Sequence, residues 1–314
     1  MHPTIQSIIC RNTNRKGKAA YQMIKDQTGS TSQCQQKNVW KDLDEEELSA
    51  FFGILLIMGS HNSNCENIKL LWKTNANPLY RATMSLKRFS HILQFIRFDH
   101  ENTRENRMQT DKAAPISEIF TMLNANLRDN YRPRENLTVD EQLFPFRGRT
   151  KFTQYMPSKP AKYGIKLWWI CDSQTYYPLT AQIYTGKSNN VREINQGERV
   201  VKDLVSYYKN SGRNVTCDNF FTSIALADSL ANWQISLVGT MKKNKACLPA
   251  EFKASSQREE LSTLFGFGEN RMICSYVPKK NKAVVLLSTL PFDHTISDIK
   301  KKPNIILFYN KTKG

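Results

Sequence analysis

The sequence predicts a mixed α/β fold in three parts: a helical region, a mixed sheet covered by helices, and a basic β-rich segment. Three observations predict it. Apolar residues recur at helical spacing up to about residue 130, strand-like runs begin at Asn136, and lysine is frequent among short β-like runs from about Lys242. We place the parts at 1–39 (a polar arm), 40–135 (the helical region), 136–241 (the mixed sheet) and 242–314 (the basic segment).

The composition indicates a folded and basic protein. The 314 residues are 40% hydrophobic and 11% aromatic, which predicts packed cores rather than disorder. A net charge of +17 favours nucleic acid or another anionic surface as the partner, the alternative being a protein that is merely basic. Lysine clusters at 279–282 and 300–302 fit phosphate contacts, an import signal or a plain solvated face.

The spacing and composition of the sequence argue against several kinds of site. The seven cysteines form no C-x-x-C pair, so we expect no zinc site, no disulfide framework and a reducing compartment. The longest apolar run, Phe51–Met58, is too short to span a bilayer, and we expect no membrane partner. No phosphate-binding glycine motif is present, and His91 is expected to pack or to face solvent rather than to act as a base.

Caps and apolar stripes predict the helical region. We expect the arm before it to be loosely held and to contain at most one helix. Asp44, with Glu47 three residues later, forms a capping-box-like start for a buried helix that Gly59 ends. Ser85 caps a second helix, and Pro115 begins a third. The stripes that predict their core faces are Leu86, Phe89, Leu93 and Ile96, then Ile116, Ile119, Phe120, Leu123 and Leu127.

The central part alternates strands and helices. The expected order is strands Leu137–Asp140, Gly164–Cys171 and Tyr177–Tyr184, a helix near 200–208, strand Asn214–Cys217, helix Ser223–Ala231 and strand Ile235–Thr240. Three strands, helix, strand, helix, strand is the order of an RNase H-like layer, in which the first and fourth strands are neighbours. The last segment adds the β-like runs Met272–Val277, Ala283–Ser288 and Ile305–Tyr309.

Asp140 and Asp218 are the candidate catalytic and metal-binding residues. Each follows an apolar strand, and neighbouring first and fourth strands would bring them together at one edge of the sheet. Phosphodiester chemistry commonly uses carboxylates that share divalent cations. The alternative is that each aspartate only bonds local backbone at a strand end. Glu141 points to the other side of its strand, and Asp172 is interpreted as a turn residue.

A segment after Asp140 interleaves cations with aromatic residues. Between Phe146 and Tyr163 such side chains can hold phosphates while the rings pack on bases or sugars, the alternative being a solvated loop. The DNA-binding candidates are Arg147, Arg149, Lys151, Lys159, Lys162, Lys166 and Asn219.

Several motifs together resemble the piggyBac transposases and their host-domesticated derivatives. They are the segments 137–149, 157–166, 217–223 and 238–240 and the closing Tyr-Asn-Lys-Thr-Lys-Gly of 309–314. The resemblance covers nearly the whole chain. It implies an RNase H-like core with three catalytic aspartates, of which Asp140 and Asp218 match the first and second. It also implies a helical dimerisation and DNA-binding region, a β-rich insertion and a homodimer on double-stranded DNA in the nucleus.

The implied activity is cut-and-paste DNA cleavage and strand transfer. Two Mg²⁺ (or Mn²⁺) ions assist nicking of a transposon end, a hairpin forms on that end, and joining occurs at TTAA. The family's third aspartate lies a few residues beyond the closing motif, and its zinc module lies further on, whereas this sequence ends at Gly314. We therefore expect a C-terminally truncated core that is inactive as given. The alternative is a non-catalytic, transposase-derived DNA-binding protein.

Overall fold

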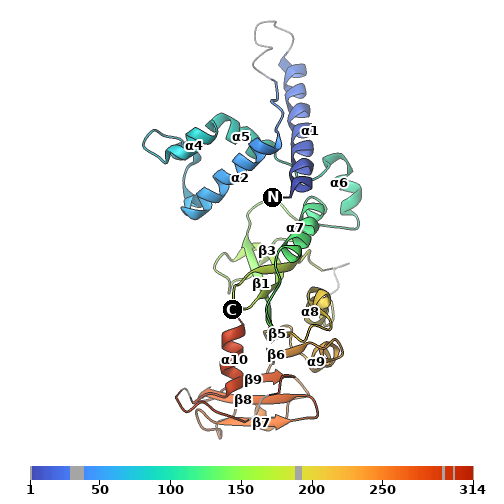
Figure 1. Ribbon diagram of the computed structural model, residues 1–314, viewed down its shortest axis with the longest axis vertical. Coiled ribbons are helices and arrows are strands. Elements are labelled where there is room, and N and C mark those ends of the chain that lie inside the picture. Colours follow the sequence, from blue (N-terminus) through green and yellow to red (C-terminus); the bar gives the residue numbers. More distant parts are fainter. Residues whose placement is uncertain (1, 29–38, 188–192, 292–293, 300, 314) are drawn as a thin grey trace. The chain divides into compact units, whose positions relative to one another are not determined.

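The computed structural model describes residues 2–28, 39–187, 193–291, 294–299 and 301–313. The chain forms two compact units, Met1–Leu123 and Asn124–Gly314, each with its own hydrophobic core (Figure 1). Within the described ranges, no helix is long and apolar enough to cross a lipid bilayer. Residue 300 of the second predicted lysine cluster lies outside the described residues.

The first unit is helical, as the sequence predicts. Its core joins buried side chains of several helices, including Leu48, Phe51, Phe89 and Ile92. The elements are α1 (Pro3–Thr28), α2 (Glu45–Ser60), η2 (Ser63–Cys65), α3 (Ile68–Leu71), α4 (Pro78–Thr83), α5 (Leu86–Phe95) and α6 (Glu101–Met108). Helix α7 (Ser117–Asp129) begins in this unit and ends in the second.

Both predicted helix caps are confirmed. A carboxylate oxygen of Asp44 accepts the backbone N–H of Glu47 at 2.7 Å at the start of α2. The Ser85 hydroxyl accepts the backbone N–H of Arg88 at 3.2 Å at the start of α5. Each bond satisfies one of the N–H groups that a helix leaves without an internal partner.

Two details of these helices differ from the prediction. Helix α2 runs through Gly59 and ends at Ser60, so that glycine does not end it. In α5 the buried face includes Ile92, whereas Leu93 is 44% exposed. Apolar residues at intervals of three and four predict the buried face of a helix only to within about one residue, which is a rotation of about 100° around the helix axis.

Residues 3–28, expected as a loosely held arm, form one 26-residue helix packed into the core. Its Ile9 is fully buried, and the Asn14 side chain accepts hydrogen bonds from the Trp40 ring N–H at 2.9 Å and the Leu43 N–H at 2.7 Å. A Cβ on Gly17 would lie 2.3 Å from the Trp40 ring, so the ring packs directly on the helix backbone. The polar composition hides this packing, because the buried part of α1 includes polar side chains such as Asn12 and Thr13.

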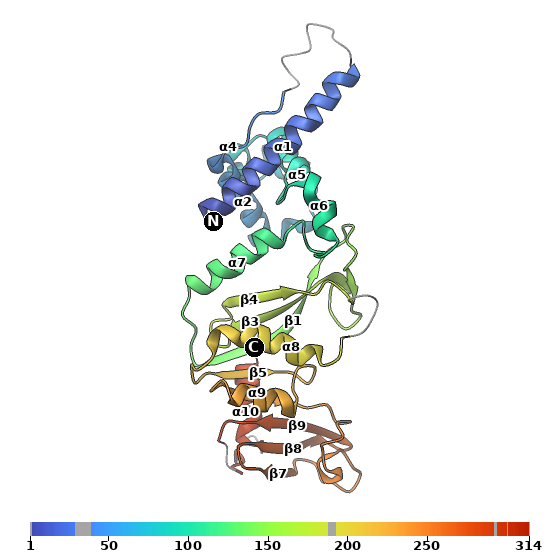
Figure 2. The ribbon, with the colours of Figure 1, turned by 90° about the vertical axis from the view of Figure 1, so that its right-hand side faces the viewer.

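The second unit is built on a nine-stranded mixed sheet. The path is β2–β3–β1–β5–β6–β9–β8–β7, with β4 also paired to β3 (Figure 2). The β1–β5 pair confirms that the first and fourth predicted strands are neighbours. This pair and β5–β6 are parallel, whereas β1–β3 and β3–β4 are antiparallel. The strands are β1 (Asn136–Pro145), β2 (Gln154–Tyr155), β3 (Tyr163–Asp172), β4 (Pro178–Ile183), β5 (Asn214–Cys217) and β6 (Ser236–Thr240).

Residues 242–314, expected as an appended β unit, continue the same sheet. Strand β9 (Lys282–Ser288) pairs antiparallel with β6, and β8 (Met272–Lys279) and β7 (Thr263–Phe267) follow it. The strand predicted at Ile305–Tyr309 is wrong: these residues lie in helix α10 (Asn304–Thr312). Pro303 precedes this helix, a favourable place for a residue with a fixed φ.

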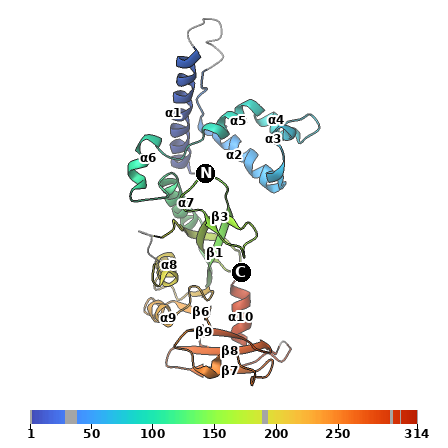
Figure 3. The ribbon, with the colours of Figure 1, turned by 180° about the vertical axis from the view of Figure 1, so that it is seen from behind.

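Helices cover both faces of the central strands. Helices α8 (Gln196–Val205) and α9 (Ile224–Ala231) lie on one face, and α10 lies on the other (Figures 1 and 3). Successive side chains along β1 and β5 point to opposite faces of the sheet. The apolar side chains of Val139 and Cys217 point into the core beneath α8 and α9. Thr138 and Thr216 therefore point to the face of α10.

Candidate active site

Asp140 and Asp218 are brought together as predicted. The parallel register pairs Val139 with Cys217, so the two aspartates are the next residues along neighbouring strands. By the two-residue period of a strand, Asp140 follows Thr138 on the α10 face, and Asp218 likewise follows Thr216. Both aspartates are half-buried, whereas the residues before them are fully buried. Strand β1, predicted to end at Asp140, continues to Pro145, so Asp140 lies in the middle of its strand and Asp218 directly follows the end of β5. The two partly accessible carboxylates are thus held side by side where the β1–β5 pairing ends.

Each aspartate also bonds its own backbone. A carboxylate oxygen of Asp140 accepts the N–H of Glu141 at 2.8 Å, and one of Asp218 accepts the N–H of Phe220 at 2.8 Å. The main-chain carbonyl of Asp218 accepts two further N–H groups, from Phe221 and Thr222, which form a tight turn after β5. These bonds use one oxygen of each carboxylate and orient it.

Lys313 is a site residue that the sequence does not indicate. Its ammonium lies 3.0 Å from Oδ2 of Asp140. The residue belongs to the closing motif, but the two partners are 173 positions apart and nothing local indicates their contact. The one sequence feature that could have pointed to Lys313 is the closing motif, in which a polar Thr-Lys pair ends an apolar run.

The electrostatic environment of Lys313 favours its charged form. Burial alone would lower the pKa of the ammonium, but the neighbouring Tyr309 and the carboxylates of Asp140 and Asp218 raise it above its ordinary value. Burial also raises the pKa of the Tyr309 hydroxyl, which hydrogen-bonds Thr240. At neutral pH the pair of carboxylates therefore faces an ammonium ion.

The donor chemistry suits Mg²⁺ or Mn²⁺, which bind carboxylate oxygens. Magnesium commonly binds one or two protein carboxylates and completes its shell with water and substrate phosphate. Asp140 and Asp218 fit that pattern as a partial ligand set. Across the part of the chain that the structure describes, no cluster of three or more His, Cys, Asp or Glu side chains could hold a metal ion.

Glu141 and Asp172 have structural contacts, in line with the sequence interpretation. Glu141 lies 2.6 Å from the Lys166 ammonium and 3.7 Å from that of Lys159. Asp172 is fully buried and accepts three backbone N–H groups, from Arg134, Gln174 and Thr175. Burial alone would raise the pKa of Asp172, but these hydrogen bonds lower it below its ordinary value.

The predicted DNA-binding residues fall into two groups. Lys159 and Lys166 are engaged with Glu141, and the Lys166 side chain is only 13% exposed and lies over aromatic rings. The second group is exposed and consists of Arg147, Arg149, Lys151, Lys162 and Asn219.

Exposed rings accompany this second group. Tyr155 and Tyr163 pack with ring centroids 4.7 Å apart, and the Arg147 guanidinium lies 4.7 Å from the centre of the Tyr163 ring. The rings are 58% and 42% exposed. The segment after β1 is thus a solvent-facing surface that combines cations with aromatic faces.

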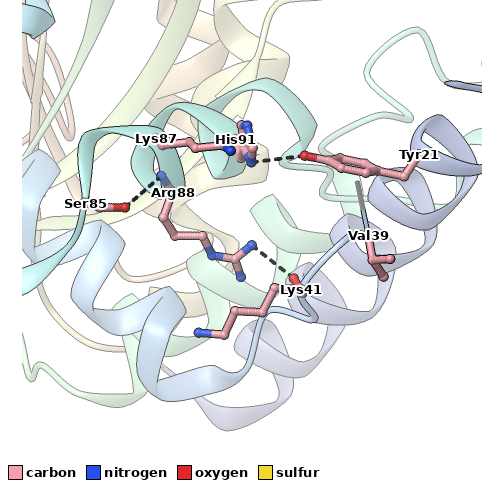
Figure 4. A pocket seen from close by; sticks show the side chains of 7 residues that line it. All are labelled: Tyr21, Val39, Lys41, Ser85, Lys87, Arg88 and His91. Atoms are coloured by element: carbon pink, nitrogen blue, oxygen red, sulfur yellow. Dashed lines mark hydrogen bonds between the residues drawn. The ribbon is translucent and has the colours of Figure 1, made fainter. Parts of the chain in front are cut away.

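The helical unit contains a separate pocket of about 300 Å³ between α1 and α5 (Figure 4). The basic side chains that line this pocket include Lys41, Lys87 and Arg88. Their positive charge is partly offset, because the Arg88 guanidinium pairs with Glu47. The His91 ring lies 3.1 Å from the Tyr21 hydroxyl, and burial together with nearby Lys87 and Arg88 lowers the pKa of the imidazole. His91 is therefore a packing residue, as the sequence indicates.

Comparison with known proteins agrees with this arrangement. A family model described as Transposase IS4 matches residues 1–314. Human PiggyBac transposable element-derived protein 3 is 26% identical over 306 residues, covering 88% of this chain and 49% of that protein. The human Chimeric ERCC6-PGBD3 protein is also 26% identical over 306 residues, with 88% and 28% covered. The chain thus spans about half or less of these relatives.

A solved structure is similar over almost the whole chain. The cryo-EM structure of a piggyBac transposase synaptic complex with hairpin DNA superposes with a TM-score of 0.88 and 34% sequence identity. The match covers 99% of this chain and 63% of that one. From the strand order, the paired aspartates and these likenesses, we conclude that the chain belongs to the piggyBac family of transposases and transposable element-derived proteins.

Proposed function

We propose that the protein binds double-stranded DNA and that its aspartate pair belongs to the metal-dependent nicking site of a cut-and-paste transposase, with joining at TTAA. The expectation that the chain is inactive as given is tested together with the second candidate. The observation that carries the proposal is the parallel β1–β5 register that sets Asp140 beside Asp218. The two carboxylates would hold Mg²⁺ or Mn²⁺. When bound, the cation would offset the negative charge that develops on the phosphate under attack.

The surface after β1 would orient the DNA. Arg147, Arg149 and Lys151 are exposed in the segment that begins a few residues beyond Asp140. Cations there would bind phosphates, and Tyr155 and Tyr163 offer faces for sugars or bases. The relative whose structure holds hairpin DNA supports this class of partner. Pairing of two copies through the helical unit and a nuclear location complete the proposal.

The carboxylate pair is tested by nicking of supercoiled plasmid in Mn²⁺. We expect Asp140→Asn and Asp218→Asn each to reduce the nicking rate at least about a hundred-fold, because each removes a charged ligand of the cation that would act on the phosphate. Asp129→Asn, at an exposed position of α7, is the matched control and should leave the rate unchanged. Nicking that persists in both site variants would show that it arises elsewhere.

A non-catalytic DNA-binding protein is the second candidate. It is favoured by Lys313 on Asp140 and by the partial ligand set of two carboxylates. In that case the wild type does not nick in Mn²⁺ but still binds a short duplex. The aspartate-to-asparagine variants should then bind equally well or more tightly, because they remove negative charge near phosphate. Fluorescence anisotropy with TTAA and scrambled duplexes measures this directly.

The basic surface has its own test, the salt dependence of duplex binding. Each cation that contacts phosphate contributes about 0.9 to the slope of log K against log salt. We expect the triple change of Arg147, Arg149 and Lys151 to Gln to reduce that slope by about 2 to 3. The same change at the exposed Lys279, Lys280 and Lys282 removes equal charge from the β8–β9 turn and should reduce it less. Equal reductions would contradict a specific role for the first surface.

A further inference from the structure

Lys313 is the less accessible member of its ion pair. Its side chain is 22% exposed, whereas that of Asp140 is 44% exposed. A surface lysine normally extends into water, since its long side chain loses conformational entropy when it is fixed. The position of this ammonium therefore calls for a structural cause.

The cause is the attachment of the end of α10 to the two strands that carry the aspartates. The hydroxyl of Thr138 donates to the main-chain carbonyl of Lys313 at 2.8 Å. The hydroxyls of Thr216 and Thr312 are also 2.8 Å apart, and all three threonines are buried. Thr138 and Thr216 each precede an aspartate by two residues on the same strand face. The backbone around Lys313 is thus fixed by hydrogen bonds to β1 and β5, next to the carboxylate pair.

We propose that Lys313 is a built-in counter-ion of the Asp140–Asp218 pair and competes with a divalent cation for Asp140. The inference rests on the proposed function, since it concerns the same metal-binding pair. The ammonium occupies Oδ2 of Asp140, and Oδ1 accepts a backbone N–H, so neither oxygen is free of a donor. A metal ion that binds Asp140 competes with the ammonium for Oδ2 and is repelled by its charge. Lys313 is thus a positioning residue that keeps the two carboxylates close while no cation is bound.

The first test is Mn²⁺ binding, followed by the loss of the EPR signal of the free ion. We expect Lys313→Met to bind Mn²⁺ about ten-fold more tightly than the wild type, since one competing charge is removed. Lys311→Met is the matched control, because this exposed lysine lies on the same helix. It should bind like the wild type. The double variant Asp140→Asn/Asp218→Asn should lose the binding.

The second test needs no metal. In EDTA, Lys313→Met should lower the melting temperature, because it leaves two neighbouring carboxylates without a counter-ion. In the D140N background the same change should have a smaller effect, and the difference measures the coupling of the pair. Lys313→Arg keeps the charge and should restore a wild-type affinity for Mn²⁺. Lys313→Gln serves as the second neutral variant if the methionine variant does not fold.

The outcomes separate this inference from the proposed function. Mn²⁺ binding that depends on the aspartates but is equal in the wild type, K313M and K313Q would overturn the counter-ion role and leave the metal site standing. No binding by any of these proteins would overturn both. Tighter binding in K313M and K311M alike would indicate a general charge effect and would also overturn the specific role of Lys313.

Discussion

Replacing Asp172 with alanine is expected to lower the free energy of unfolding of the second unit by about 3 kcal/mol or more. Three backbone N–H groups donate to this fully buried carboxylate, and each loses its partner in the variant. Each buried donor left without an acceptor costs about 1–3 kcal/mol. Urea denaturation followed by circular dichroism measures the change. Asp129→Ala, at an exposed position, should stay within about 0.5 kcal/mol of the wild type.

The contribution of Asp172 also depends on pH. Its pKa is lowered in the folded protein, so the stabilisation is fully present above the unfolded value of about 4 and is lost as pH falls through the folded value. The difference in stability between the wild type and Asp172→Ala should therefore be constant above about pH 5 and shrink below about pH 4. A difference that does not change with pH in acid would show that the carboxylate charge is not what the three N–H groups recognise.

Gly197→Ala is expected to disturb both stability and the site. A Cβ at this position of α8 would lie 2.4 Å from the main-chain oxygen of Phe220 and 3.0 Å from Cα of Phe221. Both belong to the turn that follows Asp218. Backbone atoms cannot rotate away as a flexible side chain does, so either the helix or the turn must move. Overpacking of this kind costs about 1–3 kcal/mol, and the orientation of Asp218 changes with the turn.

The measurement for Gly197→Ala is urea denaturation together with Mn²⁺ binding, and we expect both to weaken. Gly53→Ala is the matched control within a helix, since a Cβ there meets no atom within 4 Å. That change should stabilise α2 by up to about 1 kcal/mol, because alanine is the better helix former. A Gly197→Ala variant that unfolds and binds Mn²⁺ like the wild type would show that α8 does not constrain the Asp218 turn.

The central sheet and the aspartate pair could be predicted because their signals are local. Each strand is an apolar run of suitable length. The order of strands and helices matches an RNase H-like layer, in which the first and fourth strands are neighbours. Strand Asn214–Cys217 was predicted at its observed bounds. The caps Asp44 and Ser85 were predictable for the same reason, since capping involves residues only three apart.

Features that depend on distant contacts could not be predicted in this way. The run Ile305–Tyr309 is short and apolar, and such a run suits a strand or a buried helix equally. Its helical state brings Thr312 to Thr216, 96 positions away. Lys166 is a DNA-binding candidate by its charge, and its contact with Glu141 follows only from the register of β1 and β3, which places the two residues diagonally across from each other. Only the register reveals that partner.

The parallel pairing of β1 with β5 has a consequence for how the protein reaches its native state. Parallel neighbours need a crossover connection, and here β3, β4 and α8 lie between the two strands in sequence. Closing so long a segment costs chain entropy before the strand contacts repay it, so such pairing tends to form slowly. A molecule with native helix content but unpaired β1 and β5 has two separate aspartates. Metal binding or nicking by the carboxylate pair is therefore expected only from molecules in which β1 and β5 have paired.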